Sequence, residues 1–204
     1  MCRSLSSSLA LVLGLLVASS VATSHAASSP SGTVSCIGVE GDMLFQPGMP
    51  LVLNPDPPRT NRIKLTDASG IQCDNSGVTG GRLPITAVRV TLKANTAQGE
   101  TCGDFFGTLD LVKPKLTVKW RGDSPGGKVQ NVATSRATVA SAVWDSGTQK
   151  LVIVTNPITK GAFAGSTMTF RASLPNIEEH CNTYAFAYSN FPIGADGTST
   201  ITVP

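Results

Sequence analysis

Hydrophobic and polar residues alternate with a period of two along much of the chain. The clearest case is the run in which Leu116, Val118 and Trp120 alternate with polar or charged residues. Successive side chains of a β-strand point to opposite faces of the sheet, so this pattern predicts a strand with one buried face. Residues 61–66 and 82–94 alternate in the same way, with arginines and lysines at the positions that face water.

About ten such runs occur, separated by turn residues at roughly the 8–12-residue spacing of a sandwich or barrel. The expected strands cover residues 33–39 with 42–45, 61–66, 82–94, 105–112, 114–121, 137–144, 150–155, 167–174, 183–189 and 198–203. A tight turn is expected at Lys113-Pro114 and one short helical turn at 175–180. The pattern predicts an all-β fold, a single antiparallel β-sandwich of the immunoglobulin-like or jelly-roll type. Strand order and the choice between sandwich and barrel stay open.

Residues 1–26 are typical of a secretory signal peptide, since a positive start precedes an apolar run and small residues stand at the cleavage positions. We expect residues 27–32 to be a disordered lead and residues 33–204 to form one β-sandwich domain. No later run approaches the roughly 20 apolar residues of a membrane-spanning helix. The sequence therefore predicts a secreted, extracellular protein.

Four cysteines remain once Cys2 is lost with the signal, namely Cys36, Cys73, Cys102 and Cys181. An even number of cysteines in an exported chain predicts two disulfides, for which three pairings are possible. Positions 36 and 73 are balanced about a turn-rich proline segment, as facing positions on antiparallel strands are. This favours the pairing 36–73, which leaves 102–181.

The net charge of the whole chain is +3, and removing Arg3 with the signal leaves 15 − 13 = +2. The basic residues are expected to be spread over the strand faces rather than clustered. Because no basic stripe is apparent, we expect no nucleic-acid partner.

Few residues of the mature chain suit catalysis. His180 is its only histidine and lies beside Cys181, and no GxSxG motif supplies a serine nucleophile. Glu178 and Glu179 are adjacent, whereas glycoside hydrolysis needs two carboxylates that face each other across the substrate. The cysteine and acidic spacings fit neither a zinc nor a calcium site. We predict no enzymatic activity, no cofactor and no metal.

Two features are candidates for binding. Arg121, Gly122 and Asp123 spell a cell-adhesion tripeptide, expected in an exposed loop. In such a loop a tight turn would direct the guanidinium to receptor acids and the carboxylate to a receptor-held cation; the alternative is an ordinary polar hairpin loop. Trp144, beside a turn, is a candidate platform for a sugar ring, and packing in the core or at its rim is the alternative. Trp120 is assigned to the core.

Four stretches carry a family resemblance: the strand start at Cys36, the turn 73–82, Lys119-Trp120, and the glycine-rich segment 160–166. Together they resemble small exported β-rich proteins of unassigned function from actinobacteria. The resemblance implies an immunoglobulin-like or jelly-roll sandwich and implies neither a reaction nor a ligand. The leading hypothesis is a secreted, non-enzymatic interaction or structural protein whose partner is an extracellular protein or a glycan. A cell-adhesion ligand and a carbohydrate-binding module are the alternatives.

Overall fold

The computed structural model describes residues 28–46, 60–179 and 189–204. Within these ranges most residues lie in β-strands, and a further helical turn covers residues 177–179. The elements are β1 (Ser31–Gly32), β2 (Val34–Ile37), β3 (Glu40–Gln46), β4 (Arg62–Gly70), β5 (Gln72–Asp74), β6 (Val78–Thr79), β7 (Ala87–Thr96), α1 (Cys102–Phe105), β8 (Leu111–Asp123), β9 (Val129–Asp145), β10 (Lys150–Thr155), β11 (Lys160–Gly161), β12 (Thr169–Ser173), β13 (Ser189–Ile193) and β14 (Thr200–Val203).

The strands form one large antiparallel sheet. Its order is β13-β3-β4-β7-β8-β9-β10-β12-β14-β2-β5, and β11 pairs with β9 beside this path. The short strands β1 and β6 form a separate two-stranded sheet. The prediction of an all-β, antiparallel fold is therefore confirmed.

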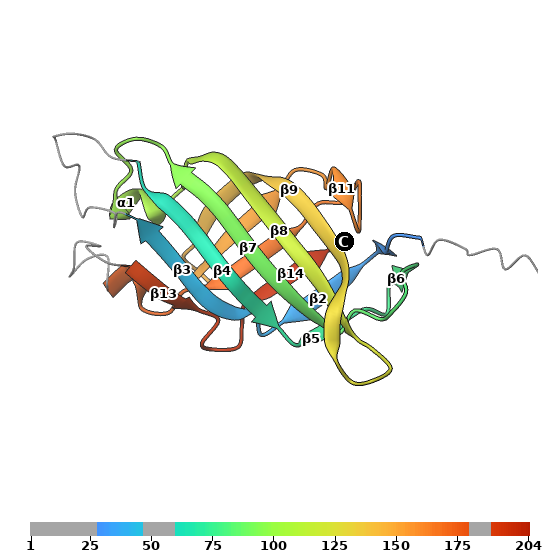
Figure 1. Ribbon diagram of the computed structural model, residues 1–204. Helices are drawn as coiled ribbons and strands as arrows, with labels where there is room; N and C mark the ends of the chain where they lie inside the picture. The colour runs from blue at the N-terminus through green and yellow to red at the C-terminus, as the bar shows by residue number, and fades with distance from the viewer. Residues whose placement is uncertain (1–27, 47–59, 180–188) are drawn as a thin grey trace, which may run out of the picture.

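The large sheet bends back on itself because several strands change partners along their length. The first part of β9, residues 129–138, pairs with β8, and its second part, residues 139–145, pairs with β10. In the same way β2 pairs with β14, while β3, which follows after two residues, pairs with β4 and β13. Figure 1 shows β3, β4, β7 and β8 crossing in front of β2 and β14. Apart from β1 and β6, the described strands thus form one continuous bent sheet, and the finer prediction of an immunoglobulin-like or jelly-roll sandwich is not confirmed.

The core lies on the inner face of this bent sheet. Leu116, Val118 and Trp120 of β8 are all 0% exposed, as their alternation predicts. The Trp120 ring meets Phe163 edge to face, with ring centroids 5.1 Å apart. Its indole Nε1 donates to the Ser135 hydroxyl at 2.8 Å, so the polar atom of this buried tryptophan has its partner. The large aromatic of β8 is therefore a core residue.

The segment 105–112, expected to be a strand, begins at the end of a helix. The alternation over 105–112 predicts a strand, but helix α1 ends at Phe105 and β8 begins only at Leu111. The Thr101 hydroxyl accepts from the Asp104 backbone N–H, and the Asp104 carboxylate accepts from the Thr101 backbone N–H at 2.7 Å. This reciprocal pair is a capping box, which satisfies two donors at the start of the helix.

The prediction of a tight turn at Lys113-Pro114 is also wrong, because both residues lie inside β8. β8 carries one residue more than β7 between two of their paired positions, and Lys113 has a φ of 51°. This is a β-bulge, which bends a strand without ending it.

The bounds of other strands agree with the prediction to different degrees. β7 begins at Ala87 and β9 at Val129, rather than at 82 and 137, while β10 covers 150–155 as expected. Of the strand expected at 183–189, residues 183–188 lie outside the described ranges.

Cys36 and Cys73 form a disulfide between directly opposed residues of β2 and β5, which confirms that pairing. Cys102 is disulfide-bonded as well, but its expected partner Cys181 lies outside the described residues, so the pairing 102–181 stays a prediction. Disulfides persist in oxidising compartments, as expected of an exported chain. The helices in the described ranges are all too short or too polar to traverse a bilayer.

The lead expected to be disordered over 27–32 is ordered from residue 28 onward. β1 pairs with β6, the Pro30 carbonyl accepts from the Phe163 N–H at 2.8 Å, and the Ser28 carbonyl accepts from the Gly81 N–H at 2.8 Å. The expectation of disorder is therefore wrong for these residues. Residues 1–27, which include the expected signal peptide, are outside the described ranges.

Candidate anion-binding face

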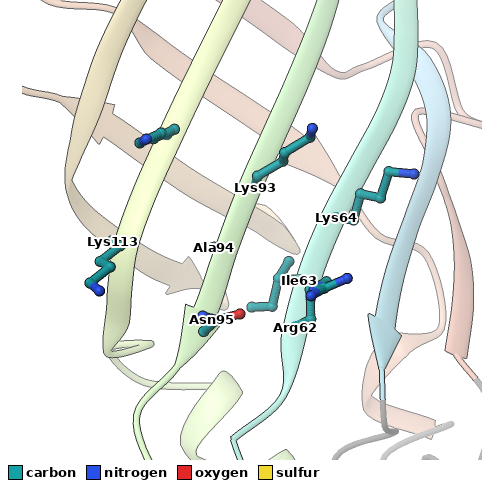
Figure 2. Close-up of a pocket in the computed structure, with 8 residues that line it drawn as sticks. Arg62, Ile63, Lys64, Lys93, Ala94, Asn95 and Lys113 are labelled. Atoms are coloured by element: carbon teal, nitrogen blue, oxygen red, sulfur yellow. The ribbon is translucent and has the colours of Figure 1, made fainter.

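A shallow hollow of about 510 Å³ lies on the outer face of β4, β7 and β8. Its lining comprises Arg62, Ile63, Lys64, Lys93, Ala94, Asn95, Lys113 and Lys115. Five of these eight residues carry a positive charge and none carries a negative one. We call these five cations, Arg62, Lys64, Lys93, Lys113 and Lys115, the cationic cluster (Figure 2).

The period-two pattern of the strands explains why the cluster faces outward. On β4, Ile63 and Leu65 are buried, and the residues between and before them, Lys64 and Arg62, stand on the other face. The neighbouring strands repeat this arrangement, with Leu92 buried beside an exposed Lys93. Core packing therefore fixes the face on which each cation lies.

The register between the strands brings three of the lysines into one line. Lys64 of β4 is directly opposite Lys93 of β7, and Lys93 is directly opposite Lys115 of β8. We call Lys64, Lys93 and Lys115 the lysine row. Like charges that face each other across neighbouring strands destabilise a sheet. The row is therefore a local cost to the fold.

Arg62, Asn95 and Lys113 form the other side of the hollow. Arg62 is opposite Asn95, and Figure 2 shows Asn95 lying between Arg62 and Lys113. The bulge of β8 contains Lys113 and so sets the direction in which this lysine leaves the strand. The hollow is thus flanked by cations along both sides, with a neutral amide between two of them.

The cluster lacks the acidic partners that usually neutralise a basic surface. In the described part of the chain, none of its five cations forms an ion pair with a carboxylate or donates a hydrogen bond to another residue. Free ammonium and guanidinium groups on one surface attract and hold anions. The expectation that basic residues are spread over the strand faces is therefore wrong for this face of the sheet.

The adhesion tripeptide does not occupy a loop. Arg121, Gly122 and Asp123 are the last residues of β8 and pair with residues 129–131 of β9. The turn follows them at residues 124–128, where the Lys128 carbonyl accepts from the Ser124 N–H at 3.0 Å. The turn therefore lies after the tripeptide, and the tripeptide itself has the extended backbone of a strand.

Contacts of the tripeptide differ from those of a displayed turn. Gly122 is buried, and a Cβ at this position would overlap the Pro84 carbonyl oxygen. The Arg121 Nη2 donates to the Val129 carbonyl at 3.4 Å. Close packing therefore accounts for the glycine, while a role in adhesion stays an untested prediction.

Trp144 is not placed as an open platform. It is 5% exposed and packs against Phe105 and Phe106, with centroid distances of 5.8 and 5.6 Å. Its Nε1 donates to the Glu178 carboxylate at 3.3 Å, which also accepts from Gln149 Nε2 at 3.3 Å. The sequence predicts Trp144 either to be a platform for a sugar ring or to pack in the core or at its rim, and in the structure it packs in the core.

No acidic residue is among those that line the hollow. Glu178 is engaged with Trp144, Glu179 is exposed, and His180 is outside the described residues. Burial raises the pKa of the Glu100 carboxyl, and the neighbouring charges of Asp104 and Asp110 raise it further. Across residues 28–46, 60–179 and 189–204, no three His, Cys, Asp or Glu side chains come together as metal ligands would.

Comparison of the chain with known protein families, with curated proteins and with solved structures found no match.

Proposed function

We propose that the chain is an exported, non-enzymatic binding protein of the extracellular space or cell envelope, and that its cationic cluster binds an anionic ligand. One observation carries the proposal. Lys93 stands directly opposite Lys64 on one side and Lys115 on the other, in a hollow that no carboxylate lines. A bound anion would offset the repulsion between these lysines, so the arrangement favours anion binding.

Two further features bear on the cellular setting and on the β-sandwich fold, which we include in the proposal. The Cys36–Cys73 disulfide and the pattern of residues 1–26 both fit export into an oxidising compartment. β9 pairs with β8 along its first part and with β10 along its second, as strands at the corners between packed sheets do, and this is consistent with the proposed sandwich.

The proposal is tested by isothermal titration of the mature protein with heparin, used as a soluble anionic probe, in 0.05 M and 0.5 M NaCl. The test variant carries Lys64→Gln, Lys93→Gln and Lys115→Gln together. The control variant carries Lys119→Gln, Lys128→Gln and Lys160→Gln, which are exposed lysines outside the hollow. Both variants lose three positive charges, so net charge is matched.

We expect the wild type and the control to bind heparin at low salt and the test variant to bind it far more weakly. We also expect the probe to be recovered at its original length, because the protein is proposed to bind without turnover. Equal loss of affinity in both variants would show that net charge alone attracts the probe. A shortened probe would contradict the non-enzymatic assignment.

A further inference from the structure

The residues that line the hollow form two lines that cross the strands. Neighbouring strands lie about 4.8 Å apart, so the lysine row spans about 10 Å across β4, β7 and β8. Arg62 and Asn95 lie two residues from the row along their strands, which is about 7 Å. A ligand between the two lines therefore meets positive charge on both flanks and at successive points along its length.

The lining chemistry discriminates among polyanions. The hollow includes no Trp, Tyr or Phe, although proteins that hold single-stranded nucleic acids stack bases on aromatic rings. Its apolar residues, Ile63 and Ala94, are buried, whereas a membrane-binding face directs apolar side chains into the lipid. These two observations argue against a nucleic acid and against a lipid surface.

The polar lining suits a sugar polymer. Four of the five cations are lysines, which act as flexible point charges and do not impose the fixed bidentate geometry of arginine. The side-chain amide of Asn95 makes no hydrogen bond within the described residues and is half-buried in the hollow. An amide of this kind donates to and accepts from hydroxyl groups, which a polysaccharide carries beside its acidic groups.

Resting on the function proposed above, we infer that the ligand is a linear acidic polysaccharide, carrying carboxylate or sulfate groups, that lies across β4, β7 and β8 between the lysine row and the Arg62–Asn95 line. The direction is set by the hollow, which includes Lys64 on β4 and Lys115 on β8 but stops before Lys119. Along β8 itself, Thr117 separates Lys115 from Lys119 on this face. For a polyanion, the basic residues along β8 alone therefore form a less continuous line of charge than the lysine row across the three strands.

A chain-length series tests this inference. Galacturonate and sulfated glucosamine, and their linear oligomers (oligogalacturonates and heparin oligosaccharides) up to the dodecasaccharide, are titrated into the full mature protein. Because a saccharide unit is about as long as the spacing between strands, affinity is expected to rise from the monosaccharide until the chain spans the lysine row, at about two to three units, and then to level off. With all five cations engaged, and with the counterion release per contact of a single-stranded nucleic acid, a plot of log Kd against log salt is expected to have a slope of about 3.5. The two glycan series separate carboxylate from sulfate as the preferred group.

Single substitutions test the direction of the polymer. Lys64→Gln and Lys115→Gln are each expected to weaken binding of the dodecasaccharide about 2- to 5-fold at 0.1 M salt, and Lys119→Gln to leave it unchanged. Weakening by Lys119→Gln without weakening by Lys64→Gln would overturn the crossing direction. Oligothymidylate and phosphatidylglycerol vesicles are run in parallel, and tighter binding of either would overturn the polysaccharide assignment.

The outcomes separate the inference from the function on which it rests. If the monosaccharide binds as tightly as the dodecasaccharide and binding needs the lysine row, the site takes small anions and the polymer inference fails alone. If no anion binds, or if binding ignores Lys64, Lys93 and Lys115, the proposed function itself fails.

Discussion

Replacing Lys93 by glutamine removes the middle charge of the lysine row while keeping a side chain of similar length. Lys93 faces Lys64 on one side and Lys115 on the other, so two like-charge contacts disappear together. Each cross-strand contact is worth roughly 0.2–1 kcal/mol, so we expect Lys93→Gln to raise the free energy of unfolding by about 0.4–2 kcal/mol.

The neighbouring variants provide an internal scale. Lys64 has Leu44 as its other cross-strand neighbour, and Lys115 has Thr138. Each end of the row therefore makes one like-charge contact where Lys93 makes two. Lys64→Gln and Lys115→Gln are expected to show about half of the gain seen for Lys93→Gln.

The assay is thermal unfolding followed by circular dichroism, in 0.02 M and 1 M NaCl, with Lys128→Gln in the exposed turn as the control. For a domain of this size a gain of 1 kcal/mol corresponds to a rise in Tm of about 2–4 °C. Salt screens charges beyond about 3 Å at 1 M, so the gain should largely vanish there. The same variant should bind heparin less tightly, because the ammonium group of Lys93 is proposed both to bind the anion and to oppose folding.

Three results would refute this reasoning. A Tm for Lys93→Gln at or below that of the wild type in low salt would show that the row is not repulsive. A gain that persists in 1 M salt would assign the effect to packing or strand propensity. A gain for Lys64→Gln equal to that for Lys93→Gln would contradict the additive, cross-strand origin of the repulsion.

Three substitutions elsewhere test the fold. Gly122→Ala should lower stability by about 1–3 kcal/mol in urea unfolding because the new methyl group meets backbone, whereas Gly126→Ala, with open space around it, should be nearly neutral. Ser135→Ala leaves the buried indole N–H of Trp120 without its acceptor and should cost about 1–3 kcal/mol, and an unchanged midpoint of urea unfolding would contradict this. Replacing Cys36 and Cys73 together by alanine opens a loop with a sequence separation of 37 and should cost up to about 4 kcal/mol; an unchanged urea midpoint would exclude a stabilising role.

Features that depend on neighbouring residues were predictable from the sequence. The alternation of Leu116, Val118 and Trp120 places all three in the core, and β10 covers the expected residues 150–155. The pairing of Cys36 with Cys73 followed from their symmetric distance to a turn. Each of these inferences needs only local pattern or chain separation.

The helix at 102–105 shows how a local signal can be overlooked. Phe105 and its apolar successors alternate well enough to predict a strand, yet Thr101 and Asp104 have the three-residue spacing of a capping box. The cap satisfies backbone groups that a strand would leave for a neighbouring strand. Reading Thr101 and Asp104 together would have found the helix, whereas hydrophobic periodicity alone did not.

The lysine row could not be predicted, because it depends on register between distant strands. Alternation correctly placed Lys64 and Lys93 toward water, but it does not say which residues face each other. Register shifts occur between Leu65 and Ala68 of β4 and between Lys93 and Asn95 of β7. A shift of one residue at either place would change which residues the lysines face. The sequence pattern does not show where the bulges lie, so the cluster cannot be predicted from it.

The fold does not require lysines at these positions, which is the strongest reason to regard them as functional. On the same outer face of the same two strands, Thr91 of β7 is directly opposite Thr117 of β8, a pairing that stabilises neighbouring strands. Two residues farther along, Lys93 and Lys115 occupy equivalent positions with the opposite effect on stability. Packing of the inner face is the same in kind at both places, since Leu92 and Leu116 are buried between them. Natural sequences tolerate such local conflicts mainly at functional sites, so this conflict supports the proposal that the lysines bind a ligand.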